Sequence, residues 1–175
     1  MADTILEKIE ALVKGGYAKA YVPKHYALRL KKVSAPYSYD NEYGETHYDL
    51  PTGGAIIKGT RGEHWSPHWT YIIKKYLLAD GSVIVPEALP VDVWIDIQTK
   101  PEAHERRKNV TWMIDPIVIS STPFKIGNLT IVPDVDMLCM NGDDKSPTTK
   151  WGFWPVKKDI AWGNDNIPAT YEALA

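Results

Sequence analysis

Residues 61–69 hold the densest group of side chains that could do chemistry. They read Arg-Gly-Glu-His-Trp-Ser-Pro-His-Trp and include Glu63, His64 and His68. An imidazole titrates near neutral pH, so a histidine beside a carboxylate suits general acid/base catalysis. One hypothesis is therefore a small hydrolase-like enzyme that uses these three residues. The alternative is that both histidines lie at a turn and form only local hydrogen bonds.

Two histidines four residues apart could also hold a metal ion from one face of a helix. Pro67 lies between them and disfavours a helical conformation at Ser66. In a strand, the two imidazoles would stand about 13 Å apart, too far for one metal. The chain has no His-Glu-x-x-His motif, no phosphate-binding glycine motif and only one cysteine, Cys139. We therefore expect no metal and no cofactor, and a buried, unreactive Cys139.

Tryptophans next to basic residues offer a second kind of chemistry. The chain has 7 Trp and 10 Tyr but only 2 Phe, so nearly every aromatic ring has a polar group. An indole face beside a cation can stack a planar ligand while the cation binds an anionic group. The alternative is that the tryptophans anchor a small β-rich core, with their N–H groups bonded to the backbone. The candidate ligand-binding residues are Arg61, Trp65, Trp69, Trp151, Trp154 and Lys157.

Trp65 and Trp154 lie in two segments that resemble each other. In residues 59–76 and 150–171, a glycine is followed by a tryptophan, a proline, an apolar stretch with lysines and a tyrosine. This internal echo indicates a duplicated unit. Chance similarity in a chain with many Trp and Gly residues is the alternative.

The same positions resemble a known protein family. Residues 50–65 contain Leu-Pro-Thr-Gly-Gly-Ala-Ile-Ile-Lys-Gly and then Gly-Glu-His-Trp, and residues 154–160 read Trp-Pro-Val-Lys-Lys-Asp-Ile. With Ala-Thr-Tyr-Glu at 169–172, they are similar to pieces of the PGDYG-type small domain of bacterial and phage proteins. Gly54 stands where that family has an acidic residue, and residues 161–168 are an insertion. The resemblance implies a small β-rich domain, and it assigns no chemistry to any residue.

A helix at the N-terminus must dock onto the rest of the chain. Thr4 and Glu7 have the spacing of a capping box, and apolar residues at 5, 9, 12 and 13 fall on one face. Gly15 and Gly16 end the helical pattern. Three turns are too short to be stable alone, so we expect this helix to pack against a larger body.

The remaining sequence is typical of short β-strands. Residues 91–99 (VDVWIDIQT) alternate, with four apolar residues on one face and Trp94 on the other. Residues 34–51 are rich in tyrosine and predict a long loop or an irregular hairpin. We expect an α+β fold, with the N-terminal helix docked on a β-rich sandwich or barrel-like body of roughly eight to ten strands. The predicted organisation is one domain, 1–175, made of the helix at 1–16 and two β-rich halves at 17–88 and 89–175.

The net charge and the hydropathy of the chain limit the kinds of partner that it can bind. The formal net charge of −2 argues against a duplex nucleic acid, because such binding depends on neutralising phosphates. No apolar run approaches the length of a membrane-spanning helix and no signal peptide is recognisable, so we expect a cytoplasmic protein without a membrane partner. The function we expect is a non-enzymatic, phage-encoded binding protein for a small anionic or nucleobase-like ligand or for a host protein. Trp94, on the exposed side of its strand, is the one hint of self-association.

Overall fold

The computed structural model describes residues 4–42, 46–166 and 168–174. Its chain divides into two compact units. We call Met1–Lys24 together with Arg107–Ala175 the terminal unit, and His25–Arg106 the central unit. The predicted halves 17–88 and 89–175 each contribute residues to both units.

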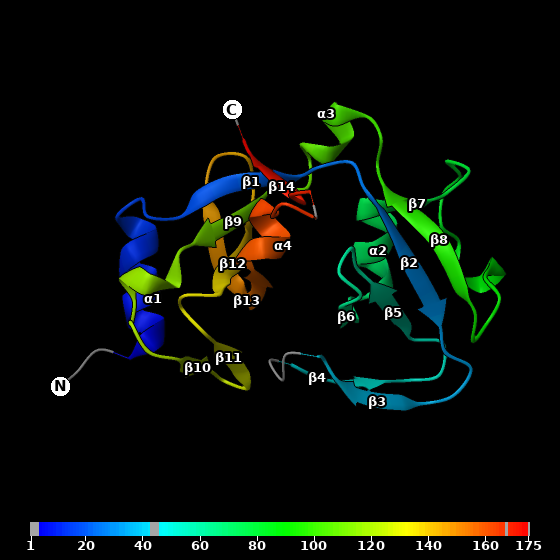
Figure 1. The fold of residues 1–175 in the computed structure, drawn as a ribbon, viewed down its shortest axis with the longest axis horizontal. Coiled ribbons are helices and arrows are strands. Elements are labelled where there is room, and N and C mark those ends of the chain that lie inside the picture. Colours follow the sequence, from blue (N-terminus) through cyan, green and yellow to red (C-terminus); the bar gives the residue numbers. More distant parts are fainter. Residues whose placement is uncertain (1–3, 43–45, 167, 175) are drawn as a thin grey trace. The chain divides into compact units, whose positions relative to one another are not determined.

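The terminal unit contains helix α1 and a five-stranded sheet (Figure 1). In spatial order the strands are β13 (Pro147–Lys157), β12 (Asp136–Gly142), β9 (Thr111–Ile114), β1 (Lys19–Pro23) and β14 (Tyr171–Ala173). The other elements are α1 (Ile5–Lys14), the 3-10 helix η2 (Pro116–Val118), α4 (Lys158–Trp162) and a hairpin of β10 (Phe124–Ile126) and β11 (Leu129–Ile131).

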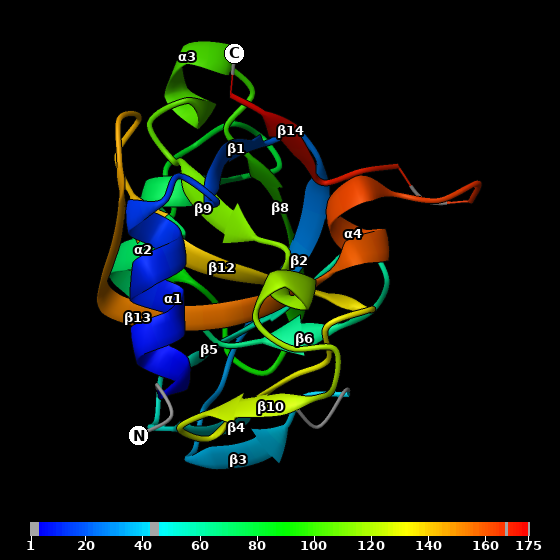
Figure 2. The same cartoon turned by 90° about the vertical axis from the view of Figure 1, so that its left-hand side faces the viewer.

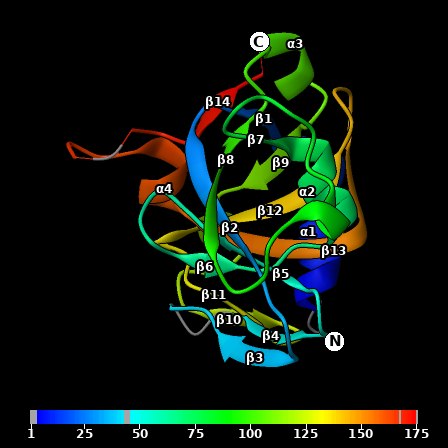
Figure 3. The same ribbon diagram turned by 90° about the vertical axis from the view of Figure 1, so that its right-hand side faces the viewer.

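The central unit also contains a five-stranded sheet (Figure 3). In spatial order the strands are β6 (His64–Trp65), β5 (Ala55–Lys58), β2 (Ala27–Lys32), β8 (Trp94–Thr99) and β7 (Tyr76–Leu78). The other elements are α2 (Trp69–Lys75), η1 (Pro86–Ala88), α3 (Ala103–Arg106) and a hairpin of β3 (Tyr37–Asp40) and β4 (His47–Leu50).

The predicted α+β class is confirmed, and the strands of both units are mostly short. Every ladder between the described strands is antiparallel. Each five-stranded sheet ends in two edge strands, so neither sheet closes into a barrel. The tyrosine-rich segment forms the hairpin β3–β4, and its residues 43–45 lie outside the described part of the chain.

Helix α1 forms and docks as the sequence predicts. Thr4 is its N-cap, and the Thr4 Oγ1 accepts the Glu7 N–H at 3.1 Å. Ile9 is fully buried and packs in a cluster with Ile114, Leu138 and other apolar residues of its unit. Figure 2 shows α1 lying across the strands of the terminal unit. The helix therefore gains its stability from one apolar face.

Strand β8 is shorter than the alternating pattern at 91–99. It begins at Trp94 because Asp92 has a φ of 60° and its carboxylate accepts the Ser34 N–H at 3.0 Å. Inside the strand the predicted alternation is confirmed. Ile97 is buried in the core and Ile95 packs against it, while Trp94 lies on the opposite face.

The two sheets have the same topology. Reading along the chain, a hairpin follows β2 and β9, and the next two strands form the same edge of each sheet. A helix then precedes the strand at the other edge, β7 or β14. In the central sheet, the remaining strand β8 lies between β7 and β2. In the terminal sheet, the remaining strand β1 lies between β14 and β9.

The strand registers match as well. One row across the central sheet pairs Ile95 with Leu30, Leu30 with Ile57 and Ile57 with Trp65. The corresponding row of the terminal sheet joins Lys19, Met113, Cys139 and Trp154. Four residues beyond Ile95, Thr99 pairs with Tyr76; four residues beyond Lys19, Pro23 pairs with Tyr171. By register, Trp65 therefore corresponds to Trp154, and Tyr76 corresponds to Tyr171. These are the Trp and Tyr residues of the two echo segments.

Docking of α1 gives a prediction about stability. Replacing Ile9 with Ala leaves a cavity under the helix, and we expect the free energy of unfolding to fall by about 2–5 kcal/mol. Leu6→Ala on the same helix is the matched control, because Leu6 is half exposed; its cost should stay under about 1 kcal/mol. Urea unfolding followed by circular dichroism measures both, and equal losses would contradict this packing.

Candidate ligand-binding site

The predicted tryptophans of the central unit anchor its core. Trp65 and Trp69 pack against the buried cluster that contains Leu30, Ile57 and Ile72. The Trp69 Nε1 donates to the Gly53 carbonyl at 2.8 Å. A Cβ at Gly59 would lie 2.8 Å from the Trp65 ring, so the indole needs a glycine beneath it. These contacts favour the structural interpretation of both indoles.

The predicted binding residues of the terminal unit have separate partners. Trp154 packs against a buried cluster that includes Cys139, which is itself fully buried. The Lys157 Nζ lies 2.8 Å from the Oδ1 of buried Asp136, and removing this lysine would leave a carboxylate charge in the core. Trp151 is 69% exposed, with the Lys150 ammonium 4.9 Å from its ring centroid.

The six predicted binding residues are therefore divided between the units. Arg61, Trp65 and Trp69 belong to the central unit, and Trp151, Trp154 and Lys157 belong to the terminal unit. Arg61 is exposed. Their joint action on one ligand stays a prediction.

The three predicted acid/base residues also have different surroundings. The His64 imidazole Nδ1 and the His64 N–H both bond to the carboxylate of Glu42, the latter at 2.9 Å. Glu63 Oε1 accepts the Arg61 N–H at 3.4 Å, a long bond, and Glu63 Oε2 is buried without a hydrogen bond. His68 is exposed at the N-cap of α2. The hydrogen-bond partner of His64 is thus Glu42, which the sequence did not suggest.

The pKa values of the two carboxyl groups near His64, Glu42 and Glu63, are shifted in opposite directions. Burial raises the pKa of Glu63, and the nearby Glu42 charge raises it further. Burial also raises the pKa of Glu42, but its hydrogen bonds from the His64 ring and N–H outweigh this and the net pKa is lowered. Glu42 therefore holds its charge toward lower pH, while Glu63 retains a proton to higher pH.

His64 lies on a basic face of the central sheet, opposite the face that carries the core. Register pairs link Arg29 to Lys58, Lys58 to His64 and Lys31 to Trp94, so these side chains share that face. The ammonium groups of Lys31 and Lys58 lie 4.8 and 5.9 Å from the Trp94 ring centroid. The His64 ring lies 5.7 Å from Trp94. We call these five residues the Trp94 face.

The terminal unit has apolar side chains at the matched positions. Trp112, Ile114, Met140 and Phe153 correspond by register to Arg29, Lys31, Lys58 and His64. This apolar set packs in the cluster that α1 and the hairpin β10–β11 cover. The position of Trp94 corresponds to Ala18, a small buried residue. One sheet design therefore presents a packed apolar face in one unit and a cationic, aromatic face in the other.

The hairpin β3–β4 borders the Trp94 face through two contacts to the β6 region. One is the Glu42 bond to His64, and the other joins the Tyr39 hydroxyl to the Ser66 Oγ at 2.6 Å. The Tyr39 ring stacks with those of Tyr37 and Tyr48, at centroid distances of 5.8 and 5.1 Å. The three tyrosine rings therefore stack in a row on one side of the hairpin.

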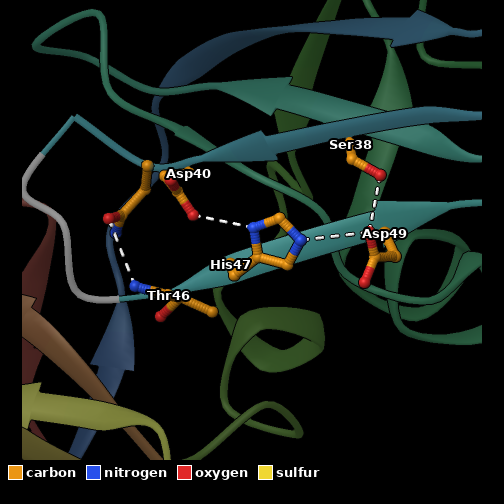
Figure 4. A network of polar contacts seen from close by, with 6 residues as sticks. Ser38, Asp40, Thr46, His47 and Asp49 are labelled. Atoms are coloured by element: carbon orange, nitrogen blue, oxygen red, sulfur yellow. Dashed lines mark hydrogen bonds and ion pairs between the residues drawn. The ribbon is translucent and has the colours of Figure 1, made fainter.

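The other side of the hairpin carries an exposed ionic network (Figure 4). The His47 Nδ1 lies 2.7 Å from Asp40 Oδ1, and its Nε2 lies 3.0 Å from Asp49 Oδ1. The Ser38 hydroxyl donates to the same Asp49 oxygen at 2.5 Å. The hydrogen bond to Asp40, followed by that to Asp49, raises the pKa of His47. The bonds from Ser38 and His47 lower the pKa of Asp49.

The sequence pointed to only part of the Trp94 face. The alternation at 91–99 identified Trp94 as lying on the non-core side of its strand. Arg29 and Lys31 come from β2 and Lys58 comes from β5, and no local motif connects them to Trp94. A strand-by-strand register was needed to bring them together.

Comparisons with protein-family models, curated proteins and solved structures found no match. Within the described residues, no three His, Cys, Asp or Glu side chains are grouped so that they could hold a metal ion. The helices of the described ranges are all too short or too polar to cross a membrane. The candidate site therefore rests on the geometry of the Trp94 face.

The hairpin network gives a prediction about pH. The raised pKa of His47 contributes stability that is present below the ordinary imidazole value and lost as pH rises through the raised value. The lowered pKa of Asp49 contributes stability that is present above the ordinary carboxyl value and lost as pH falls through the lowered value. The hairpin should thus be most stable between about pH 4 and 6.5.

Asp40→Asn should move the His47 pKa down toward its ordinary value, because the largest cause of the shift is removed. An NMR titration of the imidazole protons measures this pKa, with His47→Gln assigning the signal. Asp144→Asn, in the terminal unit, is the control and should leave the titration unchanged. An Asp40→Asn titration that coincides with the parent would contradict the network.

Proposed function

We propose that the central unit binds a small planar anionic ligand, such as a mononucleotide, on the Trp94 face. The observation that carries the proposal is the Trp94 ring with the ammonium groups of Lys31 and Lys58 at 4.8 and 5.9 Å from its centroid, on the sheet face opposite the core cluster of Leu30 and Ile57. An indole stacks with a planar ring, and neighbouring cations bind its anionic group.

The charges around Trp94 favour an anion. Arg29 adds a third permanently charged cation. Its Nε lies 3.5 Å from the Asp96 Oδ1, and both side chains are exposed. Such an exposed ion pair is weak, so Arg29 can turn to an incoming anion at little cost. The matched apolar residues of the terminal unit indicate that the sheet itself does not require these charges.

The borders of the face favour a small ligand over an oligonucleotide. Glu42 holds one side of His64, and Asp40 and Asp49 lie on the adjoining hairpin. The phosphodiester backbone of an oligonucleotide that ran beyond the face would meet these carboxylates, whose negative charge repels it. We propose that this binding is non-enzymatic and takes place in the cytoplasm, and that the protein is of phage or bacterial origin.

Adenosine 5′-monophosphate is the probe for the first test. It should quench tryptophan fluorescence and release heat in calorimetry, with adenosine and inorganic phosphate each binding at least about tenfold more weakly. Trp94→Ala should weaken binding of the nucleotide roughly tenfold or more, because one aromatic stack is lost.

Trp151→Ala is the matched control, because Trp151 also carries a lysine over its ring but belongs to the other unit. This variant should bind the nucleotide with unchanged affinity. Equal binding by Trp94→Ala and the parent protein would refute the Trp94 face as the site. Recovery of the nucleotide with an unchanged mass is the expected result for a non-enzymatic binder.

A second candidate function is acid/base catalysis by Glu63 with His64, and the raised pKa of Glu63 favours it. A carboxyl group that holds its proton to higher pH than usual can act as a general acid. Mass spectrometry of the incubated nucleotide tests this candidate. If a product forms, Glu63→Gln should reduce the rate at least about a hundredfold without weakening nucleotide binding; an unchanged rate would exclude Glu63. If no small ligand binds, the remaining hypothesis is that the partner is a host protein.

A further inference from the structure

The chain consists of two successive sets of elements in the same order. Each set runs strand, strand, hairpin, strand, strand, helix, strand: β1 to β7 in the first repeat and β8 to β14 in the second. These sets coincide with the halves 17–88 and 89–175. The matching registers of Trp65 with Trp154 and Tyr76 with Tyr171 follow the same order along the chain.

The first strand of each repeat lies in the sheet of the other repeat. β1 pairs with β9 and β14, both from the second repeat. β8 pairs with β2 and β7, both from the first repeat. The edge strands β7 and β14 each have their one ladder with an exchanged strand. A repeat without the donated strand would therefore lose two strands of its five-stranded sheet.

The connections are consistent with exchange. Only residues 24–26 separate β1 from β2, and they are Lys, His and Tyr, without the Gly, Asn or Asp that a tight hairpin turn favours. The Lys24 N–H bonds to the Thr170 carbonyl, which continues the pairing of β1 with the second repeat up to the crossing point. Exchange of identical elements is a common route by which two copies of a fold assemble.

We infer that each repeat is a strand-donating module whose partner is a second copy of the same module, here supplied by the same chain. The segment that fills each gap is the first strand of the other repeat. Buried side chains on both donated strands, Val22 on β1 and Ile97 on β8, hold them in place. The peptide connection between the repeats is then not needed to hold them together.

Cleavage of the full chain between the repeats tests this inference. A protease site inserted between Pro90 and Val91, both exposed, gives pieces 1–90 and 91–175. After cutting, the pieces should elute together at the size of the uncut chain, in equal amounts and with an unchanged circular dichroism spectrum. Separation into two folded species, or unfolding on cleavage, would overturn the inference. The uncut insertion variant is the control.

Amide hydrogen exchange in the full chain shows whether each donated strand stabilises the strands of the other repeat or those of its own. Val22→Ala on β1 should speed amide exchange about tenfold in β9 and β14 while β2 and β7 stay protected. Ile97→Ala on β8 should do the reverse. Loss of protection in the strands of the same repeat instead would overturn the inference. If either variant does not fold, the cleaved insertion variant still decides the question.

Discussion

The ladders formed by β1 and β8 are the interactions on which both units depend. Among the described strands, β14 has its ladder with β1 and β7 has its ladder with β8, so each donated strand pairs with an edge strand as well. Helix α2 leads directly into β7, whereas residues 163–170 separate α4 from β14. Each five-stranded sheet therefore exists only because a strand distant in sequence completes it. Such long-range pairing is costly in chain entropy, and the buried side chains of both strands offset that cost.

The two units carry different side chains on the same sheet topology. In the terminal unit, apolar residues at the matched positions pack under α1 and the hairpin β10–β11. In the central unit, those positions hold Arg29, Lys31, Lys58 and His64, and the last three lie 4.8, 5.9 and 5.7 Å from the Trp94 ring centroid. Placing Arg29 or Lys58 under a covering helix would bury an unpaired charge, which is strongly unfavourable. On this face Arg29 is exposed, while Lys31, Lys58 and Trp94 are partly buried.

Local patterns predicted the parts that depend on local physics. The Thr4 cap and the apolar spacing at Ile9 identified α1, because capping and amphipathicity act within a few residues. The alternation in 94–99 identified the buried and open faces of β8. The tyrosines of segment 34–51 show no clear period, so the sequence is consistent with either a loop or a hairpin. The structure shows a hairpin, in which Tyr39 pairs with and stacks on Tyr48. The pairing of His64 with Glu42 spans 22 residues and has no local signature.

The sequence alone determined the α+β class, the N-terminal helix, the side of β8 on which Trp94 lies, and the echo between the Trp65 and Trp154 segments. These follow from periodicity and composition, which are properties of neighbouring residues. Tertiary structure alone decided that β1 and β8 are exchanged, that Trp65, Trp69 and Trp154 pack in cores, and that Lys31 and Lys58 flank Trp94. Strand partners are chosen by long-range burial and hydrogen bonding, and no short stretch of sequence records that choice.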